Sequence, residues 1–124
     1  MEPLKILIIE DDPTTCALLK TTLEMEGHQA AIVHTLENED ILTLLKKEKP
    51  DILFLDFYLG TQETLPYLAL IRQDADWQDL PILMTSAIDH GQDCLGAGAH
   101  EFILKPFNWD DLIDKVNGIV KKNT

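Results

Sequence analysis

Acidic, hydroxyl and basic side chains stand directly after four short apolar runs of this sequence. The residues in these positions are Glu10, Asp11, Asp12, Asp56, Thr85, Ser86 and Lys105. Acidic residues after a strand are common, and no residue of this set is informative alone. Together they can bind a divalent cation and a phosphoryl group, provided that the fold gathers them at one place.

The alternation of apolar runs with longer amphipathic segments predicts the elements that would gather them. Compact apolar runs are typical of buried strands, and apolar residues at helical spacing are typical of helices that cover a sheet. The apolar runs predict five strands, at residues 4–9, 30–34, 52–55, 81–84 and 102–104. The amphipathic segments predict five helices, at residues 13–27, 38–48, 65–72, 90–97 and 108–122.

This order of elements, (βα)5, predicts an α/β fold with a doubly wound, five-stranded parallel sheet and helices on both faces. Ligands of such sheets bind outside the carboxyl ends of the strands, where the polar residues named above would meet. The segment 90–97 is expected to be a poor helix, because Gly91 and Gly96 lie within it.

The predicted site has the composition of a magnesium-dependent phosphoryl acceptor. Carboxylates of Glu10, Asp11 and Asp56 would repel one another at close range, and a divalent cation would remove that conflict. Oxygen ligands without histidine or cysteine favour Mg²⁺ over zinc or copper. Asp56 stands alone after the most apolar run, so we expect it to be a nucleophile that forms an acyl phosphate. Lys105 would supply positive charge to the phosphoryl oxygens, and Ser86 would supply a hydrogen bond.

Composition and charge exclude several other classes of protein. The 124 residues, 45% of them hydrophobic, suit one domain over 1–124 with a core of its own. The 22 acidic residues against 10 basic ones give a net charge of −12, which repels nucleic-acid phosphates and anionic lipid. No apolar run approaches the roughly 18 residues of a membrane span, and no signal peptide is recognisable, so we expect a cytoplasmic protein.

The cysteines and histidines predict no further site. Cys16 and Cys94 are far apart and in no metal-binding spacing, so we expect reduced thiols that pack as small apolar side chains. The four histidines share no ligand spacing and are expected at the surface. The first apolar run is not followed by a glycine-rich phosphate loop, which argues against nucleotide binding.

Four motifs of the sequence resemble those of the receiver domain of bacterial two-component response regulators. They are Ile-Leu-Ile-Ile-Glu-Asp-Asp-Pro at 6–13, Pro-Asp-Ile-Leu-Phe-Leu-Asp at 50–56, Pro-Ile-Leu-Met-Thr-Ser-Ala at 81–87 and Gly-Ala-His-Glu-Phe-Ile-Leu-Lys-Pro-Phe at 98–107. In this order and spacing they are highly specific, and the resemblance covers essentially the whole chain. It implies a flavodoxin-like (CheY-like) sheet with strand order 2-1-3-4-5.

The resemblance implies that Asp56 accepts a phosphoryl group from the phosphohistidine of a histidine kinase or of a histidine phosphotransfer protein. It implies that Mg²⁺ binds directly to Asp11, Asp56 and the backbone carbonyl of Tyr58, with Glu10 acting through water. The protein would be a signalling phosphoacceptor that assists its own phosphorylation and dephosphorylation, rather than an enzyme that acts on a separate substrate.

The resemblance also implies how the signal is passed on. Ser86 would bond a phosphoryl oxygen, and Lys105 would pair with the same group, positioned by a cis peptide bond to Pro106. Phe102 occupies the aromatic switch position, whose side chain turns inward on phosphorylation. The face made by the fourth helix, fifth strand and fifth helix would then bind an effector domain, an effector protein or a second copy of the chain. No direct nucleic-acid or membrane partner is expected.

The segment after the acceptor departs from the family pattern. Leu-Gly-Thr-Gln-Glu-Thr at 59–64 replaces a Leu-Pro and a later Asp-Gly pair, so we expect a loop of different shape. Tyr58 and Ile88 would flank the phosphate and slow the attack of water. Two alternatives stay open: a pseudo-receiver that binds partners without phosphorylation, and an aspartyl phosphohydrolase. The second needs another Asp two residues after the first, where this chain has Tyr58.

Overall fold

A five-stranded parallel sheet forms the centre of the molecule in the computed structural model, which describes residues 3–37 and 40–122. Its strands are β1 (Lys5–Ile9), β2 (Gln29–Val33), β3 (Ile52–Asp56), β6 (Ile82–Ser86) and β7 (Glu101–Leu104). They lie in the order β2-β1-β3-β6-β7, and every neighbouring pair is parallel. The predicted fold class and strand order are confirmed.

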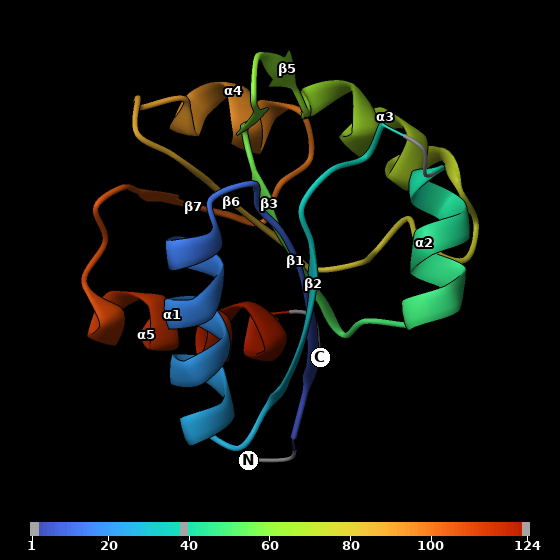
Figure 1. Cartoon of the computed structure of the whole chain (residues 1–124). Helices are drawn as coiled ribbons and strands as arrows, with labels where there is room; N and C mark the ends of the chain where they lie inside the picture. Colours follow the sequence, from blue (N-terminus) through green and yellow to red (C-terminus); the bar gives the residue numbers. More distant parts are fainter. Residues whose placement is uncertain (1–2, 38–39, 123–124) are drawn as a thin grey trace.

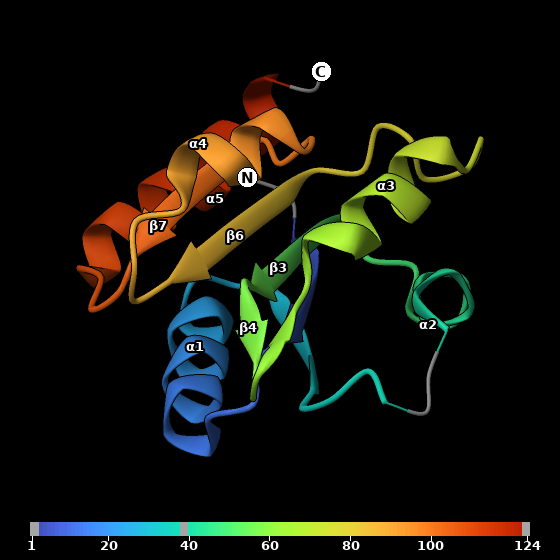
Figure 2. The ribbon, with the colours of Figure 1, turned by 90° about the horizontal axis from the view of Figure 1, so that it is seen from above.

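Helices cover both faces of this sheet. They are α1 (Pro13–Met25), α2 (Ile41–Glu48), α3 (Leu65–Gln73), α4 (Gly91–Gly96) and α5 (Trp109–Lys122). Figure 1 shows the sheet nearly edge-on, with α1 and α5 on one side and α2 and α3 on the other. Seen from above, α4 lies beside β6 and β7 (Figure 2).

The alternation of side chains along the strands builds two hydrophobic cores, one on each face. In β1, Ile6 and Ile8 pack with the side chains of α1 and α5, whereas Leu7 and Ile9 pack with those of α2, α3 and α4. All five residues of β3 are buried, which explains its unbroken apolar run. Burying one such Leu or Ile side chain contributes about 1.5–3 kcal/mol, so the central strands are the best-anchored part of the molecule.

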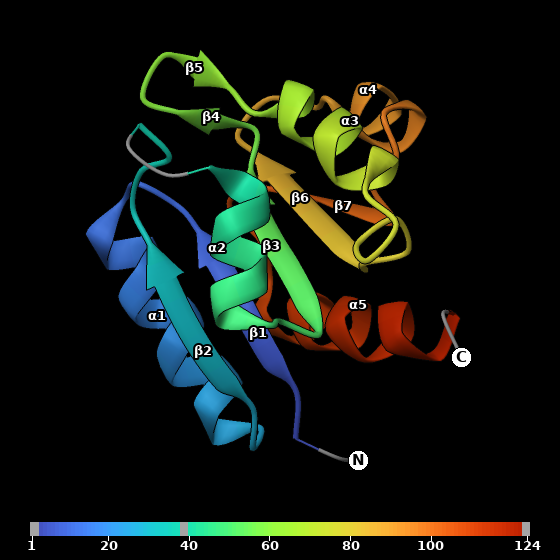
Figure 3. The same cartoon turned by 90° about the vertical axis from the view of Figure 1, so that its right-hand side faces the viewer.

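A short antiparallel hairpin, which the sequence pattern does not predict, follows β3. It consists of β4 (Tyr58–Leu59) and β5 (Gln62–Glu63), joined by a turn in which Gly60 has a φ of +63°. Figure 3 shows the hairpin beyond the carboxyl end of the sheet. Two-residue strands are too short for a hydrophobic period, so only a loop could be expected there.

Several other element boundaries differ from the sequence prediction by a few residues; the strand predicted over 81–84, for example, runs over Ile82–Ser86. The strand predicted over 30–34 runs over Gln29–Val33, so His34 lies just outside it. The helix predicted over 38–48 is described from Ile41, and residues 38–39 lie outside the described part of the chain. Asp56 and Ser86 thus end their strands instead of following them, and they stay at the carboxyl edge of the sheet.

Candidate functional site

Parallel pairing of β1 with β3 brings three carboxylates to one edge of the sheet. Ile9 pairs with Leu55, so the chain leaves both strands at the same level and places Glu10 beside Asp56. One carboxylate oxygen from each of Glu10, Asp11 and Asp56 lies within 4.8 Å of the others. Glu10 is fully buried and Asp56 nearly so, while Asp11 is exposed. This cluster of oxygen ligands can hold a metal ion, and its chemistry fits Mg²⁺.

Lys105 reaches the same carboxylates from the end of β7. Its Nζ lies 2.5 Å from Oε1 of Glu10 and 3.0 Å from Oδ2 of Asp56. The peptide bond between Lys105 and Pro106 is cis, as the resemblance implied. The structure thus brings together all three acidic residues predicted for the metal site and the predicted cation.

Burial and crowding shift the protonation of this cluster. Burial and the neighbouring Asp56 carboxylate raise the pKa of Glu10 to about 7, against the opposite effect of Lys105. Burial alone would lower the pKa of Lys105, but its hydrogen bonds to Glu10 and Asp56 outweigh burial and raise that pKa. The carboxylates are therefore short of positive charge even with Lys105 present, which is the condition that a bound cation relieves.

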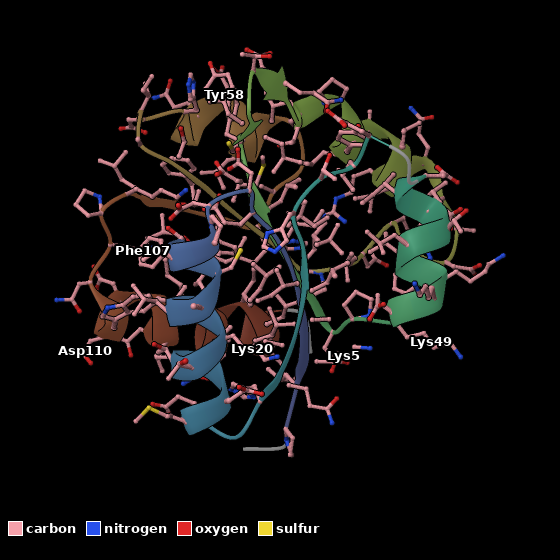
Figure 4. The ribbon with its side chains drawn as sticks, in the orientation of Figure 1. Lys5, Lys20, Lys49, Tyr58, Phe107 and Asp110 are labelled. Atoms are coloured by element: carbon pink, nitrogen blue, oxygen red, sulfur yellow. The ribbon has the colours of Figure 1, made fainter. Side chains whose placement is uncertain are left out.

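The hairpin after β3 contacts two of the acidic residues. The backbone N–H of Gly60 donates a hydrogen bond of 2.8 Å to Oδ2 of Asp11, and that of Tyr58 donates one of 3.3 Å to Oδ1 of Asp56. Figure 4 shows Tyr58 at this end of the molecule, while Lys5, Lys20 and Lys49 lie toward the other end. Backbone donors from one short hairpin therefore orient carboxylates that come from two strands.

Asp12, the third acidic residue after β1, caps a helix. Its Oδ2 accepts hydrogen bonds from the backbone N–H of Thr15 at 2.9 Å and from the Thr15 hydroxyl at 2.6 Å. These bonds lower the pKa of the exposed Asp12 carboxyl. Asp12 therefore serves as the N-cap of α1.

The hydroxyl residues at the end of β6 face different surroundings. Thr85 donates to the backbone carbonyl of Ile103 at 2.8 Å and is fully buried. The Ser86 Oγ accepts a hydrogen bond of 3.2 Å from the backbone N–H of Ile88. Phe102 is half-buried in β7 and packs against the core that α2, α3 and α4 share with the sheet.

Thr64 is a positioning residue that sequence reasoning missed. Its side chain is fully buried, and its Oγ1 donates to the backbone carbonyls of Asp56 at 2.7 Å and Phe57 at 3.2 Å. A threonine just before Leu65 is typical of a helix N-cap, yet Thr64 makes no side-chain cap bond to α3. Its position before Leu65 gives no signal of the contact with the end of β3.

The histidines are not uniformly at the surface, so that expectation is wrong. His28 is buried, and its Nδ1 accepts a hydrogen bond of 3.1 Å from the backbone N–H of Leu4. His90, just before α4, stacks on Phe57 with ring centroids 3.9 Å apart. His34 is exposed as expected. Rings can be buried in spite of a polar edge, and spacing alone does not reveal this.

Comparison with known proteins agrees with the fold. The response regulator receiver domain family matches the chain over residues 6–117. The chain belongs to this family, whose members are signalling modules of two-component systems that work with histidine kinases and effector domains. Receiver domains usually bind Mg²⁺ at an acidic pocket, and the cluster of Glu10, Asp11 and Asp56 could hold a metal ion.

Individual relatives include transcriptional regulators. The transcriptional regulatory protein TrcR of Mycobacterium tuberculosis is 26% identical over 125 residues, which cover 98% of this chain and 47% of TrcR. The alginate biosynthesis transcriptional regulatory protein AlgB of Pseudomonas putida is 33% identical over 109 residues, which cover 87% of this chain and 24% of AlgB. The chain therefore spans about half the length of TrcR and about a quarter of AlgB.

A solved structure shares the whole fold. A putative response regulator from Chloroflexus aurantiacus has a TM-score of 0.86 and 28% sequence identity, over 97% of this chain and 99% of that chain.

Among the described residues of the present structure, no helix combines the length and the apolar character that a membrane crossing requires.

Proposed function

We propose that this chain is a phosphoacceptor receiver domain of a two-component phosphorelay, and that Asp56 is the acceptor. The observation that carries the proposal is the position of Asp56, which lies in the acidic cluster with Lys105 Nζ 3.0 Å from its Oδ2. A carboxylate with a cation on one side and a metal-binding cluster on the other is suited to accept a phosphoryl group. The whole of 1–124 serves as one such domain.

Mg²⁺ would be held by Asp11, Asp56 and the backbone carbonyl of Tyr58, with Glu10 acting through water. When bound, Mg²⁺ would neutralise part of the carboxylate charge and withdraw charge from the phosphoryl oxygens. The donor set supports this assignment, because it contains oxygen only and its most buried member, Glu10, has a pKa raised to about 7.

Transfer from a phosphohistidine of a histidine kinase or a histidine phosphotransfer protein would proceed at Asp56. One carboxylate oxygen of Asp56 attacks phosphorus, the P–N bond to the donor imidazole breaks, and the imidazole leaves with the bonding electrons and takes up a proton. Lys105 and the Ser86 hydroxyl stabilise the charge on the phosphoryl oxygens. Tyr58 and Ile88 flank the phosphorylated carboxylate and slow its hydrolysis, which the same site assists.

Output would pass from Ser86 to Phe102. Engagement of the phosphoryl group by Ser86 shifts the segment after β6, and the Phe102 side chain turns inward. The face of α4, β7 and α5 then binds an effector domain, an effector protein or a second copy of the chain, in the cytoplasm. The net charge of −12 opposes direct contact with nucleic acid, so any DNA-binding output would lie elsewhere.

The proposal is tested with acetyl phosphate and Mg²⁺, followed by intact mass spectrometry. We expect one added phosphoryl group in the wild type and none in Asp56→Asn. Asp111→Asn, a matched exposed carboxylate on α5, should be phosphorylated like the wild type. Retained phosphorylation of Asp56→Asn would relocate the acceptor. No phosphorylation of the wild type would favour the pseudo-receiver, and turnover of phosphomonoesters would favour the phosphohydrolase.

A further inference from the structure

We infer that His90 is a positioning residue that holds the segment between β6 and α4 in its unphosphorylated arrangement, by stacking on Phe57. This inference rests on the proposed function, because Phe57 directly follows the proposed acceptor Asp56. It adds a residue, His90, to which neither the family match nor the sequence motifs assign a role.

Three rings from two different segments meet beside the acceptor. The rings of His90 and Phe57 are nearly parallel, with an interplanar angle of 6° and centroids 3.9 Å apart. Tyr58 packs edge-on against both, 4.7 Å from Phe57 and 5.8 Å from His90 between centroids. These ring contacts join the two residues that follow β3 to the residue that precedes α4.

One side of this stack is fixed and the other is weakly held. The backbone N–H of Phe57 donates to the carbonyl of Thr85 at 2.8 Å, and its own carbonyl accepts from the N–H of Thr64 at 2.9 Å. His90 precedes a helix of six residues, and its side chain makes no cap bond to that helix. If the two rings separate, His90 is therefore the one that moves.

The stack is also less favourable than it would be with a purely apolar ring. Nε2 of His90 is buried without a hydrogen-bond partner, and it is the single side-chain nitrogen or oxygen in that condition among the described residues. Nδ1 faces Oδ2 of Asp93 at 3.8 Å, beyond hydrogen-bond distance. An unpaired buried polar atom costs free energy, so this contact opens at a lower cost than a stack of two apolar rings would.

The segment that carries His90 connects the phosphoryl site with the switch. Ile88 donates its backbone N–H to Ser86 Oγ at 3.2 Å, and the carbonyl of His90 accepts the N–H of Cys94 at 2.9 Å in the first turn of α4. A Cβ added at Gly91 would lie 3.4 Å from the ring of Phe102. A shift that travels along the chain from Ser86 to α4 therefore passes through His90.

The test compares two substitutions with opposite expected effects. His90→Phe keeps a flat ring on Phe57 and removes the unpaired nitrogen, whereas His90→Ala removes the stack. Beryllofluoride with Mg²⁺ serves as a phosphoryl analogue, and its affinity is measured by calorimetry. A ligand that needs the stack open binds more tightly when the stack is weaker. We expect about threefold to tenfold tighter binding for His90→Ala and weaker binding for His90→Phe, from the usual strength of an aromatic pair.

Opposite directions separate a positioning role from a merely structural one. Loss of general packing would change both variants in the same direction, and that result would overturn the inference. Phosphorylation of the wild type by acetyl phosphate is measured in parallel. If the wild type takes no phosphoryl group, the proposed function fails and the inference fails with it. If the wild type is phosphorylated and the two variants do not diverge, the inference alone fails.

A measurement on the wild-type protein needs no substitution. The ring current of Phe57 should shift the carbon-bound proton signals of the His90 imidazole upfield in the NMR spectrum of the free protein. Addition of beryllofluoride and Mg²⁺ should move these signals toward the position of an unstacked imidazole. Signals that stay upfield in the saturated protein would contradict the inference, even if a variant failed to fold.

Discussion

Two helices that follow residues of the site, α1 after the acidic residues of β1 and α4 after Ser86, differ in length, capping and composition. α1 has 13 residues and begins with the Asp12 side chain capping it. α4 has six residues, begins and ends with glycine, and has no side-chain cap. Short helices with glycine open locally at lower cost than long capped ones. The difference indicates that the charged cluster rests on rigid elements, while the part that must respond is weakly built.

Lys105 directly follows β7 and contacts the carboxylates of Glu10, which follows β1, and of Asp56, which ends β3. Lys105→Met should cause the largest effect, a fall of about 10²–10³-fold in the rate of phosphorylation by acetyl phosphate, as expected when one stabilising charge is removed. The rate is measured by intact mass against time. Lys115→Met is the matched control, since Nζ of Lys115 lies 3.3 Å from Glu101 and away from the cluster. Equal rates for the two variants would remove Lys105 from the proposed mechanism.

Near the charged cluster, Thr64 should contribute to the stability of the protein and to the position of Asp56. Thr64→Val leaves the buried carbonyl of Asp56 without its 2.7 Å hydrogen bond, which should lower the free energy of unfolding by about 1–3 kcal/mol. Urea unfolding measures the loss. Phosphorylation should slow as well, because the end of β3, which carries Asp56, is held less firmly. Thr21→Val, at an exposed position of α1, should change neither quantity. A stable Thr64→Val with normal phosphorylation would show that the hairpin alone holds the strand end.

The two cysteines allow the local opening of α1 and of α4 to be compared. Cys16 in α1 and Cys94 in α4 are both buried, and burial raises the pKa of each thiol to about 11. Few thiolates are present at pH 8, so iodoacetamide should react slowly with the folded protein at both sites and faster as the pH rises toward 11. We expect Cys94 to react about tenfold faster than Cys16, because α4 opens more easily.

Peptide mass spectrometry identifies which of the two thiols has reacted. In urea both cysteines should react at similar rates, which provides the control for their intrinsic reactivity. Faster reaction of Cys16 than of Cys94 in the folded protein would mean that α1 opens more easily than α4, which would contradict the prediction.

Much of this comparison could be predicted from the sequence, because it depends on strong local signals. The unbroken apolar run before Asp56 specifies a strand buried on both faces, and Gly91 and Gly96 indicate a poor helix. Once the strands are parallel, the residues after them must meet at one edge, so Glu10, Asp11 and Asp56 were expected together and are found within 4.8 Å. Chain connectivity made that part of the site predictable.

The contacts that the sequence did not reveal are those made by groups without a periodic signal. The hairpin strands have two residues each, and Thr64 has the appearance of a helix cap. The stack of His90 on Phe57 joins residues 33 positions apart in the sequence. Only the folded chain brings these two rings together. Such contacts depend on the exact path of loops, which propensity and spacing do not fix.

The smallest effect is expected from strengthening α4 itself. Gly96→Ala adds a methyl group that meets no atom within 4 Å, and it should raise the free energy of unfolding by about 0.5–1 kcal/mol through helix propensity. Alkylation of Cys94 should slow in the same variant while that of Cys16 stays unchanged. Gly98→Ala is the contrasting substitution, because Gly98 has a φ of +113° and an added Cβ would lie 3.2 Å from Arg72. It should lower the free energy of unfolding by about 1 kcal/mol or more. Destabilisation by Gly96→Ala in urea, or an unchanged Cys94 rate, would mean that glycine is not what weakens α4.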